Sequence, residues 1–259
     1  IAIRRPMKTP EAGTEVFAID TRTTGAPNFT SGFPVDAALH RLITDGNNNR
    51  ISARLTGTKF LNTNNTAVEG ASTDFTFDYM EGWFQDSSTN TDAYSWMFKR
   101  ATGFMDVVCY TGTGSATTQA HNLGVVPELM IVKSRTDTKD WGVYNSTDGA
   151  EYYTYLNSNG AKIAGGGSLW NDTAPTETVF SVGAGSDTNA SGQTYIAYLF
   201  ATLAGVSKVG SYTGTAADLN VDCGFTAGAR YILIKRTDSS GDWYTYDSAR
   251  GISAGNDPY

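Results

Sequence analysis

The sequence has few of the side chains that perform acid–base, thiol or metal chemistry. Among 259 residues there are two histidines and two cysteines. Cys109 and Cys223 form no CxxC or other metal-ligand spacing. We expect both to be buried as small apolar side chains, with a disulfide between them as the alternative. The sequence therefore predicts no metal site, no cofactor and no catalytic residues.

Runs of positive charge and long hydrophobic runs are also absent. The formal net charge is −7, and lysine and arginine are scattered along the chain. Proteins that bind nucleic acid need clustered cations to neutralise phosphates. The longest apolar stretch, YIAYLFATLAGV at 195–206, is shorter than the roughly 20 residues that cross a bilayer as a helix. We therefore expect neither nucleic acid nor a membrane as a partner.

An internal repeat is the strongest feature that is present. DVVCYTGTG at 106–114 returns as KVGSYTGTA at 208–216, an offset of 102 residues. The same offset relates LMIVK at 129–133 to YILIK at 231–235, and the pair Asp140 and Trp141 to Asp242 and Trp243. A constant offset over this length indicates a duplicated structural unit.

We predict three units from this repeat. Residues 1–104 form a degenerate first unit with an insertion near 21–50, residues 105–207 a complete second unit, and residues 208–259 the start of a third. AIRR at 2–5 is a weak counterpart of LIKR at 233–236. Units of about 100 residues are longer than solenoid repeats, so we expect each to have its own core. The first and last units are expected to be incomplete.

The segments within a unit have the composition of β-strands. ELMIVKS at 128–134, DWGVYNS at 140–146 and TYIAYLFAT at 194–202 are rich in β-branched and aromatic residues. Clusters of Gly, Asn, Asp and Ser separate them and favour turns. Only VDAALHRLI at 35–43 is typical of a helix. The sequence therefore predicts an all-β fold of tandem antiparallel β-sandwich or jelly-roll units.

The repeated phrases also resemble a known family. DVVCYTGTGSATTQAHNLGVVPELMIVKSRTDTKDWGVYNS, WNDTAPTETVFSVG, NASGQTYIAYLFA and IKRTDSSGDWYTYDSARG look like the repeated module of large bacteriophage virion proteins, often described as tail-fibre-like and common in marine phages. The resemblance covers residues 104–259 and, more loosely, 1–103, where the Asp-Trp pair is missing. It implies a non-enzymatic structural or adhesion protein on the surface of an extracellular virion. Such a protein would be a homo-oligomer whose partners are other virion proteins and glycans of the host surface.

The remaining chemical side chains favour structural roles. His121 lies in a turn and is expected to be hydrogen-bonded there, while the other histidine is His40. The carboxylate pairs Asp86 with Asp92 and Asp137 with Asp140 lie in polar turns, where solvent exposure would leave them without catalytic properties.

Tryptophans are the candidates for contact with a partner. Trp141 and Trp243 each begin a predicted strand, and their recurrence favours a core position over sugar binding. Trp83 and Trp170 are flanked by loops and are the better candidates for binding a partner. Two other structural readings remain: a decoration protein on the capsid exterior, or an array of carbohydrate-binding modules with exposed aromatic platforms. A polysaccharide depolymerase would instead require paired carboxylates in a groove.

Overall fold

The computed structural model describes residues 7–42, 48–85 and 91–251. The protein is all-β, as the sequence predicts, and its paired strands all run antiparallel to their neighbours. Helical segments in this part of the chain are single turns: η1 (Gly13–Glu15), η2 (Arg54–Thr56), α1 (Gly167–Trp170) and α2 (Ser186–Asn189). None of the helices described is long and apolar enough to cross a membrane.

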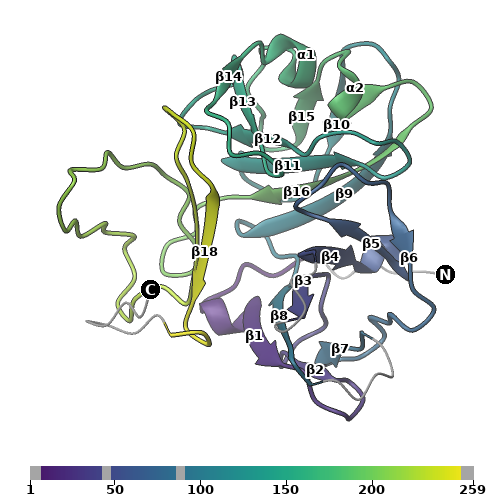
Figure 1. Ribbon diagram of the computed structural model, residues 1–259, viewed down its shortest axis with the longest axis vertical. Coiled ribbons are helices and arrows are strands. Elements are labelled where there is room, and N and C mark those ends of the chain that lie inside the picture. The colour runs from purple at the N-terminus through teal and green to yellow at the C-terminus, as the bar shows by residue number, and fades with distance from the viewer. Residues whose placement is uncertain (1–6, 43–47, 86–90, 252–259) are drawn as a thin grey trace.

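Two six-stranded sheets form the body of the molecule and lie one above the other in Figure 1. The first contains, in spatial order, β1 (Phe17–Thr21), β8 (Ala93–Phe98), β3 (Ala37–Leu42), β4 (Arg50–Ala53), β5 (Lys59–Asn62) and β6 (Gly70–Ala71). The second contains β9 (Met105–Thr111), β16 (Thr194–Phe200), β11 (Leu129–Ser134), β12 (Gly142–Asn145), β13 (Tyr152–Tyr155) and β14 (Ile163–Ala164).

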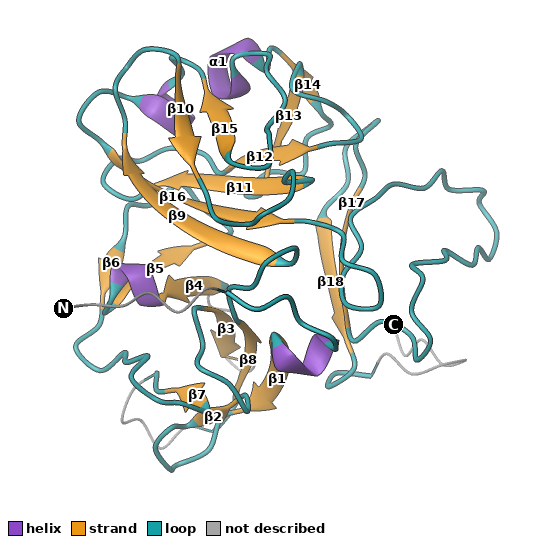
Figure 2. Ribbon diagram, turned by 180° about the vertical axis from the view of Figure 1, so that it is seen from behind, coloured by secondary structure: helices purple, strands orange, loops and turns teal. Residues whose placement is uncertain are grey.

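Three two-stranded ladders complete the described structure. The first pairs β2 (Phe29–Thr30) with β7 (Gly82–Trp83), and the second pairs β10 (Thr117–Ala120) with β15 (Val179–Val182). The third is a hairpin of β17 (Tyr231–Lys235) and β18 (Trp243–Asp247), which lies beside both sheets in Figures 1 and 2. We call it the C-terminal hairpin.

The two large sheets have the same strand order and the same register. Ala37 of β3 faces Phe98 and Ala53 in the first sheet. Leu129 of β11 faces Phe200 and Asn145 in the second. The edge strands match as well, because β5 pairs with β6 in the register in which β13 pairs with β14. The first sheet is therefore a complete counterpart of the second.

The C-terminal hairpin repeats part of this pattern. Tyr231 faces Asp247, and these residues lie 102 positions after Leu129 and Asn145, which face each other across β11 and β12. Hence β3, β11 and β17 are equivalent strands, and β4, β12 and β18 are their equivalent neighbours.

The predicted helix at 35–43 is wrong. Residues 37–42 form β3, a central strand between β8 and β4. Ala37, Ala38 and His40 are all buried, because β3 has side chains packed on both of its faces. A strand that is buried on both faces lacks alternation, and its apolar run can be mistaken for a helix.

The expected insertion near 21–50 is contradicted as well, because this range contains strands of the first sheet. The described part of that range contains the last residue of β1, all of β2 and β3, and the first residue of β4, and β1, β3 and β4 have counterparts in the second sheet. The suggested match of AIRR at 2–5 to LIKR at 233–236 lies outside the described residues. The strand of the first sheet that is equivalent to β17 is β3.

The largest core lies between the two sheets and belongs to both. The first sheet contributes Trp96 and Phe98, and the second contributes Val143, Ile196 and Tyr198. The C-terminal hairpin packs against this shared core through Tyr231 and Trp243. The expectation that each unit would have a core of its own is therefore wrong for the inner faces of the sheets.

The outer face of each sheet has a separate core. In β16, Tyr195, Ala197 and Leu199 point into the outer core of the second sheet, while Ile196 and Tyr198 point into the shared core, as the period of two in a strand requires. The ladder of β10 and β15 contributes Phe180 and Val182 to that outer core, and helix α1 contributes Leu169 and Trp170. The ladder of β2 and β7 contributes Phe29 and Trp83 to the outer core of the first sheet.

A buried ion pair lies at the start of the second sheet. Asp106 is fully buried and its Oδ1 is 2.6 Å from both Nε and Nη2 of Arg100. The same oxygen accepts a hydrogen bond from the Val107 amide at 2.9 Å, and Oδ2 accepts one from the Asn122 amide at 2.7 Å. One carboxylate thus joins the connection between the sheets to the segment that precedes β11.

Replacing Arg100 with methionine is expected to lower the free energy of unfolding by about 3–5 kcal/mol, because it leaves a buried carboxylate without its counter-ion. Arg236→Met is the matched control, since Arg236 and Asp238 form an exposed pair with side chains 58% and 77% accessible. Its expected cost is below about 1 kcal/mol. Urea denaturation of both variants measures the difference, and equal midpoints for the two would contradict the prediction.

Candidate functional site

The two tryptophans proposed to contact a partner are buried. Trp83 and Trp170 have no accessible surface. Trp83 lies between the rings of Phe29 and Phe77, with centroids 5.5 and 5.3 Å away, and donates a hydrogen bond to Ser95 Oγ. Trp170 ends α1 and packs 6.0 Å from Tyr144. The prediction is wrong because the loops flanking these residues fold over the outer faces of the sheets.

The two histidines are held by hydrogen bonds. His121 Nε2 lies 3.0 Å from the carbonyl oxygen of Thr176, and its Nδ1 accepts from the Leu123 amide. The predicted turn histidine is thereby confirmed. His40 is buried in β3, with Nδ1 3.2 Å from Gln85 Nε2 and Nε2 3.4 Å from Ser52 Oγ.

Cysteines and acidic pairs form no reactive cluster in the described structure. Cys109 is exposed, Cys223 is half-buried and both are free thiols, so burial and a mutual disulfide are both wrong. Asp140 accepts a hydrogen bond from Asn157 Nδ2, while Asp137 lies 3.6 Å from Lys139 Nζ. Asp86, of the pair with Asp92, lies outside the described residues. Among the described side chains no group of three His, Cys, Asp or Glu could hold a metal.

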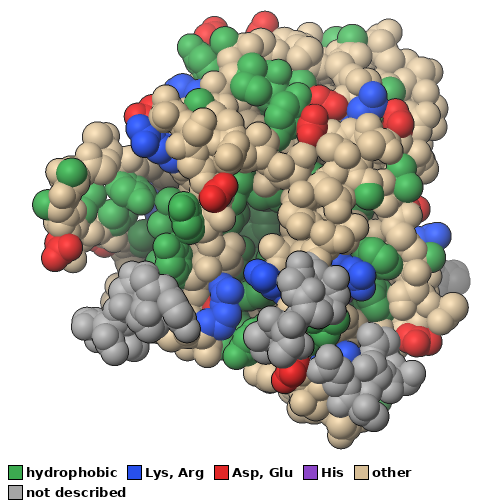
Figure 3. Space-filling view, in the orientation of Figure 1, with side chains coloured by type: hydrophobic (Ala, Val, Ile, Leu, Met, Phe, Trp, Pro, Cys, Tyr) green, Lys and Arg blue, Asp and Glu red, His purple; other side chains and the backbone are tan. Residues whose placement is uncertain are grey.

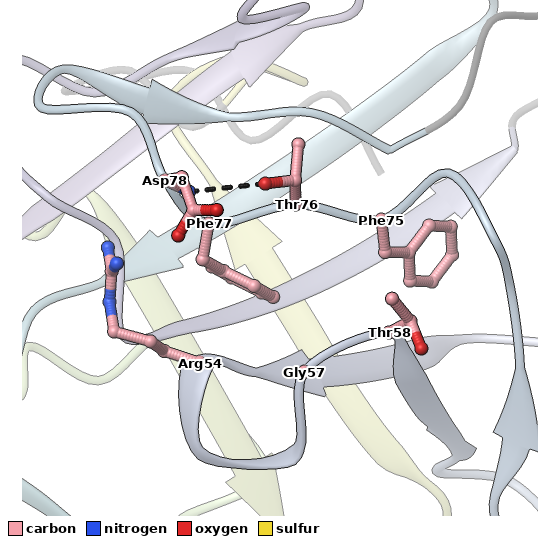
Figure 4. Close-up of a pocket in the computed structure, with 7 residues that line it drawn as sticks. All are labelled: Arg54, Gly57, Thr58, Phe75, Thr76, Phe77 and Asp78. Atoms are coloured by element: carbon pink, nitrogen blue, oxygen red, sulfur yellow. Dashed lines mark hydrogen bonds between the residues drawn. The ribbon is translucent and has the colours of Figure 1, made fainter.

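Two hollows in the described surface are open to solvent. One, of about 330 Å³, lies over η2 and has Arg54 and Asp78 at one end and Thr58 and Phe75 at the other (Figure 4). Its dashed hydrogen bond joins the Asp78 amide to Thr76 Oγ1. The other, of about 380 Å³, is lined by His121 and Glu177 among others. Each contains a single carboxylate.

Buried polar contacts join the two large sheets. Trp141 has no accessible surface, and its Nε1 donates to the carbonyl oxygens of Asn62 at 2.9 Å and Asn65 at 3.2 Å. Asn62 ends β5, so a side chain that precedes β12 of the second sheet is bonded to the strand next to the edge of the first sheet. A buried indole N–H normally has such a partner.

A second contact lies beside the first. The amide of Glu69 donates to the carbonyl oxygen of Arg135 at 2.8 Å. The side chains of these two residues also pair, with Arg135 Nε 2.8 Å from Glu69 Oε2 and Nη2 3.3 Å from Oε1. Together, the Trp141 and Glu69 contacts define what we call the junction.

The indole and backbone contacts of the junction recur between the second sheet and the C-terminal hairpin, whereas the side-chain ion pair does not, because Lys162 and Thr237 replace Glu69 and Arg135. Trp243 Nε1 donates to the Tyr155 carbonyl oxygen at 3.0 Å, and the Lys162 amide donates to the Thr237 carbonyl oxygen at 2.9 Å.

The numbering shows that these contacts are equivalent. The docking residues shift by 243 − 141 = 102 and 237 − 135 = 102 positions, while the receiving residues shift by 155 − 62 = 93 and 162 − 69 = 93. Both contacts therefore recur with fixed offsets, which identifies a second copy of one interface.

The first sheet lacks the docking tryptophan. Strands β3 and β4 precede β11 and β12 by 92 residues, so the position equivalent to Trp141 is 141 − 92 = 49, which is Asn49. The first sheet thus has the receiving half of the junction without the tryptophan of the docking half.

Sequence recurrence identifies only the donor half of this interface. Recurrence of the Asp-Trp pair identified Trp141 and Trp243, and the predicted core position of Trp141 is confirmed. The acceptors are backbone carbonyls, which any residue provides, so the sequence contains no mark of them.

A recurrent lysine stabilises each docking loop. Lys133 is fully buried, and its Nζ donates to the carbonyl oxygens of Ser134 at 2.7 Å and Asp137 at 3.3 Å. Its counterpart, Lys235, donates to Gly241 at 2.7 Å and Asn159 at 3.2 Å. Burial lowers the pKa of Lys133 to about 8, and burial also lowers the pKa of Lys235.

The lowered pKa of Lys133 predicts a pH-dependent stability. Between about pH 8 and the ordinary lysine pKa of 10.5, the unfolded chain binds the proton more tightly than the folded chain. The free energy of unfolding therefore gains about 3 kcal/mol from this residue as the pH rises through that window. Thermal melts of the wild type and of Lys133→Met should diverge in slope between pH 8 and 10, and parallel profiles would refute the prediction.

Comparison with known proteins identifies a family without assigning an activity. No curated protein and no solved structure matches the chain. One family, described as a domain of unknown function (DUF7483), matches residues 41–257. That range includes the second sheet, the C-terminal hairpin and most of the first sheet, and the chain therefore belongs to the DUF7483 family.

Proposed function

We propose that this chain is a non-enzymatic structural or adhesion protein of a bacteriophage particle, as part of a tail fibre or similar appendage. The observation that supports the proposal best is the recurrent junction, because one interface used twice is a means of building an extended rigid body. The finer organisation we propose is a tandem series of related β-units of about 100 residues. The resemblance of the repeated phrases to phage virion modules provides the virion context.

The distribution of polar contacts favours assembly over catalysis. An indole hydrogen bond, a backbone amide bond and an ion pair join the two large sheets, at Trp141, Glu69 and Arg135. A glycoside-cleaving site needs two carboxylates about 5–10 Å apart, whereas each of the two open hollows has one. A depolymerase is therefore less well supported than a structural protein.

A carbohydrate-binding array is the second candidate. It requires an exposed aromatic platform, and the aromatic pair that fits best is Tyr244, which is 52% exposed, with Tyr246 at a centroid distance of 6.3 Å. Trp83 and Trp170 give this function no support, because both are buried. A capsid-exterior decoration protein would use the same junctions and differs only in its place on the particle.

The oligomeric mass of the protein tests the proposal. Light scattering coupled to size exclusion, across a hundredfold range of concentration, is expected to give a closed multimer such as a trimer. A strict monomer would overturn the fibre and favour a decoration protein or a glycan-binding array. Labelling purified virions with an antibody against the chain tests the location, and label confined to soluble material would contradict a virion protein.

A further inference from the structure

The C-terminal hairpin is an unfinished version of the second sheet. Strand β11 has a neighbour on each edge, β12 on one and β16 on the other. Its counterpart β17 pairs with β18 alone among the described strands. The edge of β17 that corresponds to the β16 side of β11 therefore has no strand beside it in the described residues.

The segment that would flank a missing strand is also present. Strand β9 borders the other edge of β16. The turn that leads into β9, where Ala101 bridges Met105, recurs with Leu203 bridged to Ser207, 102 residues later. After this second turn, residues 208–213 form no strand, although they repeat part of the β9 sequence.

Side-chain exposure follows the same pattern. Tyr110 of β9 is 9% exposed, but its counterpart Tyr212 is 51% exposed. Met130 and Val132 of β11 are buried, whereas Ile232 and Ile234 of β17 are only half-buried. Hydrophobic side chains gather over the hairpin in Figure 3. Strands β9 and β11, which flank β16, thus have sequence counterparts in residues 208–213 and in β17. Apolar side chains of both counterparts are more exposed to solvent than their equivalents in the second sheet.

The edge of β17 lacks the usual protection against pairing. Exposed edge strands commonly contain charged residues, proline or bulges that discourage added strands. The sequence YILIK has one charge, and that charge belongs to Lys235, whose Nζ is bonded to two carbonyls. The edge is therefore free to accept a strand through backbone hydrogen bonds.

We propose that this edge of β17 is an acceptor site for an antiparallel β-strand of the chemistry of β16. In such a strand, side chains equivalent to Tyr195, Ala197 and Leu199 cover the outer face of the hairpin. Those equivalent to Ile196, Tyr198 and Phe200 close the shared core. The register of β11 with β16 places the counterpart of Phe200 opposite Tyr231 and the counterpart of Ile196 opposite Lys235.

This inference deepens the proposed function by naming the partner chemistry through which the assembly extends. It rests on that function in treating the repeated junction as a building contact. Its own support is the register shared by β11 and β17, which does not depend on the virion setting.

A peptide tests the acceptor site on the intact chain. The probe has the sequence of residues 194–202, with two lysines added at each end for solubility. Two controls are a scrambled peptide of equal composition and a peptide with proline at the position of Tyr198, which removes a backbone donor. Peptide binding is measured by fluorescence anisotropy, and its location by hydrogen exchange.

We expect saturable binding of the probe and at least tenfold slower exchange of amides in 231–235, with protection also appearing in 207–213. The scrambled and proline peptides should give neither effect. Equal binding of all three peptides, or protection confined to other strands, would overturn the acceptor site. Protection of 231–235 that grows with protein concentration without peptide would overturn it in favour of pairing between copies.

The peptide result and the mass measurement fail independently. A peptide that does not bind to a chain that forms closed multimers rejects the acceptor site and leaves the assembly role standing. A monomeric chain that binds the peptide rejects the fibre and leaves the strand acceptor standing.

Discussion

Trp141→Ala is expected to lower the free energy of unfolding by about 3–5 kcal/mol, among the largest single-residue effects in this chain. The side chain is fully buried in the shared core, and its removal leaves a cavity that both sheets line. It also leaves the carbonyl oxygens of Asn62 and Asn65 without their indole donor. Urea denaturation followed by circular dichroism measures the loss.

Two variants separate the cavity from the hydrogen bonds. Trp141→Phe keeps most of the volume and removes the N–H, so its expected cost is about 1–2 kcal/mol. Trp243→Ala alters the second junction, where the tryptophan is only half-buried, and should cost less than Trp141→Ala. It should release the C-terminal hairpin, seen as faster exchange of amides in 231–247, while the sheets remain folded. Equal losses in Trp141→Ala and Trp141→Phe would show that packing at this position is unimportant.

Acid is expected to destabilise the protein through His40. Burial, followed by the charges of Arg50 and Arg22, lowers the pKa of His40 from 6.5 to about 3. The unfolded chain then binds a proton at a pH where the folded chain does not, so this contribution to stability is complete above about pH 6.5. It declines as the pH falls from 6.5 towards 3, and at pH 4 the loss is about 3 kcal/mol.

A His40→Gln variant tests the assignment of this acid sensitivity. Glutamine retains hydrogen-bonding groups for Gln85 and Ser52 but does not titrate in this range. Its unfolding free energy should change less than that of the wild type between pH 6.5 and 4, even if it starts lower. His121→Gln is the matched control. In His121 burial also lowers the pKa, but the Thr176 carbonyl and Asp106 oppose that shift. A variant as acid-sensitive as the wild type would exclude His40 as the cause.

The sequence predicted the fold class because local composition determines it. Strands such as β11 and β16 are rich in branched and aromatic residues, and turn residues separate them. Strand β3 was missed because it is buried on both faces. Without β3, the sequence did not show that the first sheet is equivalent to the second. Equivalent strands of the two large sheets lie 88 to 102 residues apart in the sequence, because the connections between strands differ in length. A search at a single offset therefore misses some of these equivalences.

The candidate site was harder to predict than the fold. Trp83 and Trp170 occur in loop-like sequence, and only the tertiary structure places those loops over the sheets. At the junction, recurrence identified the indole donors but not the carbonyls that receive them. The amino-acid sequence specifies the side chains, whereas the acceptor half of this interface consists of backbone carbonyls.

The junction has a fixed polarity along the chain. At both junctions the indole donor lies in the part of the chain that comes later, and the carbonyl acceptor lies in the sheet that comes before it. The two halves also differ in how mutation can affect them. A single substitution of the tryptophan removes the donor, whereas the acceptors are backbone carbonyls that a side-chain change leaves in place. Mutations can therefore weaken the junction more readily from the docking side than from the receiving side.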